Sequence, residues 1–177
     1  MSEPRVNELL AIALAVLEEE GLEKLGVGTI SRRAGIKPPS LYKQFTSKAD
    51  IEQQLADLGF RLWAKELAAA SAALPSTASR RDHIAALALS YRALGRGNPQ
   101  LFRLMNERPF LGAQLVAEVG EVAAIDYDTL FPNVTAGMSF WAWGHGILML
   151  EIVGRFPPEV DLDEMWNTMI DSIGAIE

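Results

Sequence analysis

The 177-residue chain contains no cysteine, only two histidines and few aromatic residues, which make up 8% of it. The absence of cysteine excludes disulfide bonds and thiolate metal sites, and it is typical of a reducing compartment. His83 and His145 lie far apart in the sequence and form no HxxxH or HExxH pattern. We therefore expect neither a metal site nor a cofactor.

Long uncharged runs are also scarce, and residues 129–150 are the one candidate for a membrane span, which needs about 20 apolar residues. Pro132 and Asn133 interrupt this run, and Glu151 follows it directly. A helix buried on several sides by protein is therefore the better prediction, with no membrane partner. The acidic N-terminal segment lacks the basic leader and apolar run of a signal peptide, so the expected location is the cytoplasm.

Basic residues are fewer than acidic ones, and the formal net charge is −7. In one segment, however, the local net charge is positive. Residues 26–48 hold five Lys or Arg and no Asp or Glu. Residues 1–48 carry seven basic and six acidic side chains, whereas residues 49–177 carry nine basic and seventeen acidic ones. A nucleic-acid-binding protein concentrates positive potential where the phosphates lie. The charge pattern therefore predicts a nucleic-acid contact within residues 26–48.

Apolar residues recur at three- and four-residue intervals through most of the chain, and no window alternates with the period of a strand. The chain is therefore predicted to be all-α, with about nine helices. A long helix is expected to begin at Ser47, where Asp50 three residues later completes a capping box, and to run until Pro75. Later helices are expected over residues 81–95, 99–107, 112–131, 133–156 and 161–176.

The first helices have the lengths and spacing of a DNA-binding motif. A helix from about Arg5 to Gly21 precedes a two-turn helix that ends at Gly35, and Lys37-Pro38-Pro39 starts a third helix. Two short helices around a glycine turn make a helix-turn-helix, whose second helix enters the major groove. The alternative is a solvated basic face on a packing helix.

The outward residues of this region combine groups that suit bases and phosphates. Lysine reaches guanine acceptors, Ser and Gln bind base edges, and proline offers shape contacts only. Tyr42 and Lys48 suit phosphates, and Lys48 lies in the first turn of the long helix, where the dipole also favours an anion. The expected DNA-binding residues are Thr29, Arg32, Lys37, Pro38, Pro39, Ser40, Tyr42, Lys43, Gln44 and Lys48.

The order AGI-KPPSLYKQF-TSK, after a helix ending EEEGL, resembles the N-terminal domain of the TetR family of transcriptional regulators over residues 5–50. Gln44 departs from the second aromatic residue that is common there, and Gly26 and Gly28 depart from a capping Thr and a basic or polar residue. The resemblance implies that residues 1–46 form a helix-turn-helix domain that binds double-stranded DNA and regulates transcription.

The segment WAWGHGILMLEIVG, residues 141–154, resembles the C-terminal domain of some TetR-type regulators, which is known by a Trp-His-Gly signature. The resemblance implies that residues 47–177 form a helical domain that encloses a cavity for an inducer and makes a homodimer through its last two helices. Several of the apolar residues also follow a 3-4-3-4 spacing along one seam. The expected dimerisation residues are Met138, Trp141, His145, Gly146, Leu148, Ile152, Trp166 and Ile170.

Large apolar or amphipathic residues that are expected to face inward are candidates for binding the effector. They are Phe60, Trp63, Tyr91, Phe102, Met105, Phe110, Phe140 and Trp143, and for any one of them taken singly ordinary core is the better explanation. His145 is more readily explained as a hydrogen-bonded core residue than as a ligand group. The scarcity of charge in these segments predicts a small, largely apolar effector.

The sequence thus predicts a ligand-responsive regulator, a repressor, that binds an inverted-repeat operator as a homodimer and has no enzymatic activity. One alternative is a DNA-binding regulator that acts through a protein partner without a small molecule. A helical enzyme is the other, but no nucleophile beside a base and no paired carboxylates occur at a readable spacing.

Overall fold

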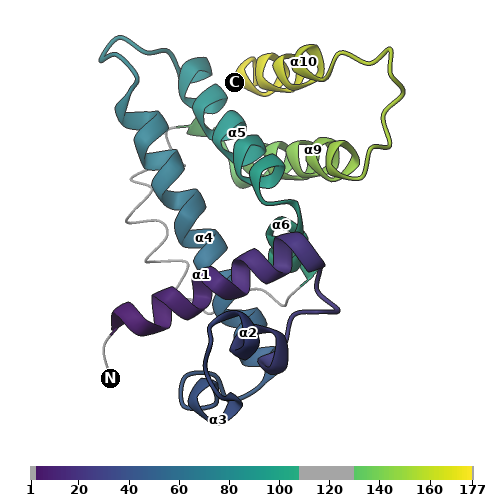
Figure 1. Ribbon diagram of the computed structural model, residues 1–177. Coiled ribbons are helices and arrows are strands. Elements are labelled where there is room, and N and C mark those ends of the chain that lie inside the picture. Colours follow the sequence, from purple (N-terminus) through teal and green to yellow (C-terminus); the bar gives the residue numbers. More distant parts are fainter. Residues whose placement is uncertain (1–2, 108–129, 177) are drawn as a thin grey trace. The chain divides into compact units, whose positions relative to one another are not determined.

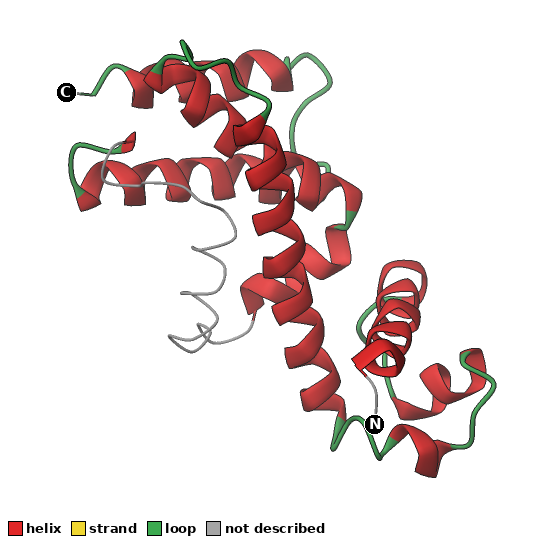
Figure 2. Ribbon diagram, turned by 90° about the vertical axis from the view of Figure 1, so that its left-hand side faces the viewer, coloured by secondary structure: helices red, strands yellow, loops and turns green. Residues whose placement is uncertain are grey.

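The computed structural model describes residues 3–107 and 130–176, and all regular elements within them are helices (Figure 2). The predicted all-α class is confirmed, with eight helices in these two ranges. The helix expected over residues 112–131 falls almost entirely outside the described residues, as does Phe110. The elements are α1 (Glu3–Glu20), α2 (Val27–Arg33), α3 (Pro38–Leu41), α4 (Lys48–Ala72), α5 (Arg80–Gly97), α6 (Pro99–Glu107), α9 (Val134–Ile152) and α10 (Leu162–Gly174).

Side-chain caps fix where several of these helices begin. The Ser47 half of the predicted capping box of α4 is confirmed, because Ser47 Oγ accepts a hydrogen bond from Asp50 N at 3.1 Å. The Asp50 carboxylate in turn accepts from Thr46 N at 2.6 Å. Burial raises the pKa of Asp50, but the hydrogen bonds from Gln54 and Thr46 outweigh it and lower that pKa. Asn133 caps α9 by accepting from Ala136 N at 3.0 Å.

The described chain forms two compact units, and the boundary between them falls inside α4. Unit 1 contains the described residues up to Arg61 together with residues 98–107, and unit 2 contains residues 62–97 and 130–176. Helix α6 therefore belongs to the same unit as α1, α2 and α3. A functional division at residues 46 and 47 remains a prediction, but the compact units do not follow it.

Unit 1 is held together by α1, which packs against both α2 and α6 (Figure 1). Its fully buried side chains include Leu17, Ile30 and Phe102. Glu18 joins α1 to α6, since its carboxylate accepts hydrogen bonds from Gln100 N at 3.2 Å and Leu101 N at 2.7 Å. These two N–H groups belong to the first turn of α6, where backbone donors have no partner within the helix. A carboxylate is also favoured there by the helix dipole.

Unit 2 is a three-helix packing of α5, α9 and α10, each of which contacts the other two (Figure 1). Leu148 of α9 lies so close to Gly95 of α5 that a Cβ at Gly95 would be 2.7 Å from Leu148 Cδ2. Trp166 and Ile170 of α10 are 1% and 0% exposed. None of the described helices is long and apolar enough to cross a membrane.

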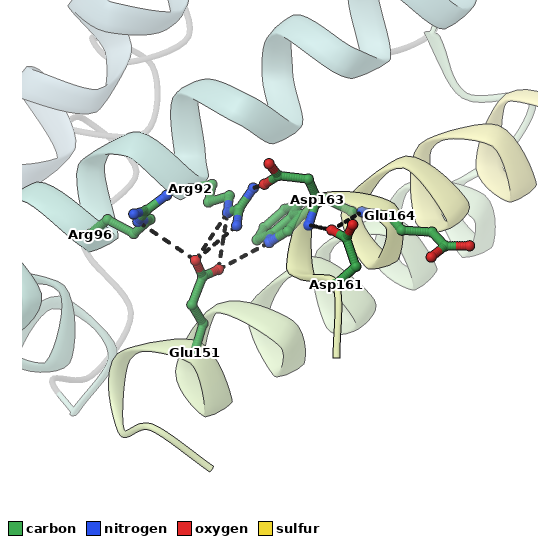
Figure 3. A network of polar contacts seen from close by, with 7 residues as sticks. Arg92, Arg96, Glu151, Asp161, Asp163 and Glu164 are labelled. Carbon is green, nitrogen blue, oxygen red and sulfur yellow. Dashed lines mark hydrogen bonds and ion pairs between the residues drawn. The ribbon is translucent and has the colours of Figure 1, made fainter. Parts of the chain in front are cut away.

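A buried ion-pair network joins the three helices of unit 2 (Figure 3). Arg92 of α5 donates through Nε and Nη2 to Glu151 of α9, with Nη2 2.9 Å from Oε1. Arg92 also pairs with Asp163 of α10, and Trp166 Nε1 donates to Glu151 Oε2 at 3.1 Å. Only 9% of the Arg92 side chain and 8% of the Glu151 side chain are exposed, so the pair is shielded from solvent. The sequence alone did not predict this network.

Candidate functional site

The turn between α2 and α3 is built by Gly35, whose φ of +64° lies in the left-handed region. Ile36 N donates to Ser31 O at 3.0 Å, and Gly35 N donates to Arg32 O at 3.3 Å. This pair of bonds is a Schellman motif, which requires the left-handed residue that glycine supplies without strain. The predicted glycine turn of the helix-turn-helix is therefore present.

Helix α3 is a single turn that presents its polar side to solvent. Lys37 precedes it in an extended conformation, with φ −78° and ψ 145°, and Pro38 and Pro39 occupy its first turn. Leu41 and Phe45 are fully buried on the inner side of this turn. Because these two anchors fix the orientation of the turn, Tyr42 stays 56% exposed on the opposite side.

Most of the residues expected to bind DNA lie on the surface of unit 1. Thr29 and Gln44 are half-buried. The exposed residues are Arg32, Lys37, Pro38, Pro39, Ser40, Tyr42, Lys43 and Lys48. These eight residues, which are rich in cations and hydroxyl groups, are together called the basic face. Such a surface can contact phosphates and base edges.

Two cations of this region already have partners within unit 1. Arg33 pairs with Glu19 and, at 3.6 Å, with Glu20 at the end of α1. Lys48 Nζ donates to Leu22 O at 2.9 Å and lies 3.8 Å from Glu52. Lys48 thus ties the start of α4 to the segment after α1, so substituting it would disturb the fold as well as any phosphate contact. The ion pairs of Arg33 were not predicted from the sequence, although the three consecutive glutamates at residues 18–20 could have indicated them.

The residues expected to bind an effector divide between the two units. Phe102 and Met105 of α6 are buried in unit 1, where half-buried Phe60 also lies. In unit 2, Trp63 and Tyr91 pack edge to face, with ring centroids 5.7 Å apart. Seven of the eight candidates are thus divided between two units, and Phe110 lies outside the described residues.

An aromatic cluster does form in unit 2, around a residue that was expected at a dimer contact. Trp141 packs edge to face on Trp63, Tyr91 and Phe140, with centroids 5.0, 5.1 and 5.3 Å away. Trp143, in contrast, is 39% exposed, so the expectation that it faces inward is wrong. Helix α9 carries no charge before Glu151, so apolar periodicity could not tell its inner face from its outer one.

Tyr91 and His145 form a polar pair at this cluster, with the hydroxyl oxygen 3.1 Å from His145 Nδ1. Burial raises the pKa of Tyr91, and burial lowers the pKa of His145. Both groups are therefore neutral near pH 7. This contact gives His145 a hydrogen-bonded role inside unit 2, although it was expected at a dimer contact.

Three of the residues expected at a dimer contact need correction. Leu148, Trp166 and Ile170 are at most 1% exposed, so they pack inside unit 2 and are unavailable to a second chain. Trp141 is half-buried in the aromatic cluster. Met138 is 58% exposed, and Gly146 and Ile152 are half-buried. For Leu148 the error comes from α9, whose buried and exposed faces are both apolar. Trp166 and Ile170 lie on the one apolar face of α10, and that face packs inside unit 2.

Metal ligands are not gathered anywhere in the part of the chain that the structure describes. Residues 3–107 and 130–176 contain no group of three or more His, Asp or Glu side chains that could hold an ion.

Comparison with known proteins identifies both halves of the chain. Residues 9–55 match the family model "Bacterial regulatory proteins, tetR family", and residues 84–173 match "Tetracyclin repressor-like, C-terminal domain". None of the curated protein sequences matches the chain.

Solved structures with the same fold cover almost the whole chain. The crystal structure of the regulatory protein SCO4313 is 25% identical, with a TM-score of 0.72, over 96% of this chain and 95% of that one. A TetR variant from Acinetobacter baumannii AYE in complex with minocycline is 18% identical, with a TM-score of 0.69, over 99% and 95%. The fatty acid degradation regulator FadR from Bacillus halodurans is 13% identical, with a TM-score of 0.64, over 99% and 97%.

Proposed function

Because the chain belongs to the TetR family of DNA-binding transcriptional regulators, we propose that it is a homodimeric repressor that binds an inverted-repeat operator and releases it when a small, largely apolar effector binds. The basic face is the observation that carries the DNA-binding part of this proposal. We further propose that the chain has no catalytic role.

The basic face has the chemistry that operator recognition needs. Lys37, Ser40 and Lys43 are exposed on or beside α3, and residues 26–48 contain no acidic side chain. Lysine and serine can bind base edges, and the same cations attract phosphates. Buried Leu41 and Phe45 hold this turn in place, so the face is presented by a rigid support.

Lys43→Ala is expected to weaken binding to the preferred operator by about 1–3 kcal/mol and to relax sequence preference at one position of each half-site. The operator would first be selected from a random DNA pool, and affinity would then be measured by fluorescence anisotropy between about 50 and 200 mM salt. Lys65→Ala is the matched control, because it removes an exposed lysine of α4 outside unit 1. Equal effects of the two substitutions, or binding insensitive to salt, would contradict the assignment.

A second copy of the chain is the partner proposed for the exposed face of α9. Five of the seven large hydrophobic residues that are exposed in the described ranges lie in residues 134–153. Met138, Trp143 and Leu150 are 58%, 39% and 44% exposed, and Gly146 beside them has open space where a Cβ would lie. An apolar patch with a small residue at its centre suits close, two-fold packing of identical helices.

Gly146→Leu is expected to shift the protein from dimer to monomer in sedimentation velocity, with little loss of helix content. An added Cβ there has no atom within 4 Å, so loss of the dimer would indicate a partner that approaches closely. Gly97→Leu is the matched control, because Gly97 is an exposed residue of α5 that also has open space. A monomeric parent protein, or a dimer that tolerates Gly146→Leu, would count against this interface.

The aromatic cluster of unit 2, which comprises Trp63, Tyr91, Phe140 and Trp141 with His145 beside it, supports the effector part of the proposal. Its rings offer an apolar surface, and most of it lies in the part of the chain that matches the repressor-like C-terminal domain. Couplings of about 1–3 kcal/mol between two sites change affinity by about 5- to 150-fold. Helix α4 begins at the Ser47 cap and continues into unit 2. We propose that this helix transmits the effect of effector binding to the basic face.

An effector of this kind should both raise the melting temperature and change DNA affinity. A panel of apolar compounds would be screened by thermal shift and then by operator anisotropy. If compounds stabilise the protein yet leave DNA affinity unchanged, or if none binds, regulation through a protein partner becomes the better hypothesis.

A further inference from the structure

One polar group of the aromatic cluster has no hydrogen-bond partner. Trp63 Nε1 is buried, and within the described residues nothing accepts its N–H. The whole side chain is 8% exposed, so solvent does not satisfy the donor either. A buried donor without an acceptor costs about 1–3 kcal/mol. A ligand that offers an acceptor to this N–H would therefore gain more binding free energy than it would at a donor that is already hydrogen-bonded.

The surroundings of this donor define what can approach it. Tyr91 and Trp141 present ring edges and faces to Trp63, with centroids 5.7 and 5.0 Å away. Trp141 and His145 are half-buried, so part of the cluster is in contact with solvent. Planar apolar groups pack well in edge-to-face and offset arrangements with such rings.

Charge is absent from the cluster. Its members are Trp, Tyr and Phe with a histidine that burial keeps neutral by lowering its pKa. The neighbouring Arg92 is neutralised by Glu151 and Asp163 in the network of Figure 3. An ionic ligand would lose its hydration here without gaining an opposite charge from these cluster residues, which disfavours carboxylates and ammonium groups.

On the basis of the function proposed above, we propose that the effector is an uncharged, planar apolar molecule with a carbonyl-type acceptor that takes the hydrogen bond of Trp63 Nε1. The competing explanation is that the N–H is satisfied by the face of a neighbouring ring, a weak interaction that needs no ligand. The two explanations differ in whether an acceptor on a ligand improves binding.

The test uses three naphthalene probes of one size. 2-Acetylnaphthalene carries a neutral acceptor, 2-isopropenylnaphthalene replaces its C=O by C=CH₂, and 2-naphthoate adds a negative charge. Dissociation constants would be measured by equilibrium dialysis for the parent protein, for Trp63→Phe and for Trp141→Phe. Circular dichroism would check that each variant keeps its helix content. Operator affinity would be measured with each probe present.

The parent protein is expected to bind the ketone about tenfold more tightly than the alkene, and the carboxylate most weakly. Trp63→Phe keeps an aromatic ring but removes the donor, so it should bring the ketone and the alkene to equal affinity. Trp141→Phe, the matched control, should keep the tenfold difference.

Equal binding of ketone and alkene by the parent, a difference that survives Trp63→Phe, or tightest binding of the carboxylate would each overturn the inference. If ketone and alkene bind equally but both change operator affinity, the effector function stands and the assigned ligand chemistry fails. If no probe binds while the operator is still bound, the inference fails, and the effector function loses the support of this cluster.

Discussion

Glu151→Ala is expected to lower the free energy of unfolding by about 3 kcal/mol, because it leaves the Arg92 guanidinium buried without its bidentate partner. This value is at the lower end of the usual loss of stability on breaking a buried ion pair, because Asp163 still contacts Arg92. Trp166 Nε1 loses its acceptor in the same variant. Equilibrium unfolding in urea, followed by circular dichroism, would measure the change.

Two further variants separate the buried charge from simple loss of contacts. Asp163→Ala should have a much smaller effect, because that side chain is 79% exposed. The double variant Arg92→Met with Glu151→Leu should recover most of the lost stability, since replacing both partners by apolar residues removes the uncompensated charge. A double variant as unstable as Glu151→Ala would show that the charge is not the cause.

Phe102→Ala should lower the free energy of unfolding by about 3–5 kcal/mol and should weaken the helix-turn-helix, although α6 lies far from it in sequence. Phe102 is 0% exposed and belongs to unit 1 together with α2 and α3. The sequence suggested either an effector-binding role or ordinary core for this residue, without saying which helices it supports. Hydrogen exchange should report faster exchange of Ile30 and Leu41 amides.

Phe140→Ala is the matched comparison, because it truncates a phenylalanine of unit 2 that is 2% exposed. It should speed exchange in α5 and α10 and leave the Ile30 and Leu41 amides protected. If Phe102→Ala and Phe140→Ala accelerate the same amides, the two units do not open independently and the assignment of α6 to unit 1 has no energetic meaning.

Features that depend on neighbours in sequence were predictable. The Ser47 and Asp50 cap, the turn at Gly35 and the inner face formed by Leu41 and Phe45 each involve residues within a few positions of one another. Their physical requirements, a hydrogen-bond acceptor, a left-handed backbone and helical spacing, are visible in the residue types. The surface that α3 presents follows from them.

The faces of α9 were not predictable in the same way. Its residues before Glu151 are all uncharged, so burial of Phe140 and exposure of Trp143 left no contrast in the pattern. The seam that includes Leu148 has helical spacing but packs on Gly95 of the same chain. Periodicity identifies which residues share a face, and it does not say what covers that face.

Contacts between distant segments were also missed. Arg92 and Glu151 are 59 positions apart, and Glu18 reaches amides 82 and 83 positions away in α6. Each residue alone resembles an ordinary charged residue of a helix. Only the three-dimensional structure shows that the pair of Arg92 and Glu151 joins α5 to α9 and that Glu18 joins α1 to α6.

The placement of α6 affects how hybrid regulators could be built from this chain. A graft that moves residues 1–46 onto another effector domain would leave behind α6, and with it the amides that Glu18 binds. It would also leave behind Gly59 of α4, where a Cβ would lie 2.4 Å from Met105 Sδ and where only glycine fits without movement of that side chain. A DNA-binding unit that can be moved to another protein therefore consists of two separate stretches of sequence. The recipient protein must either have a matching helix at the position of α6 or be given α6 of this chain.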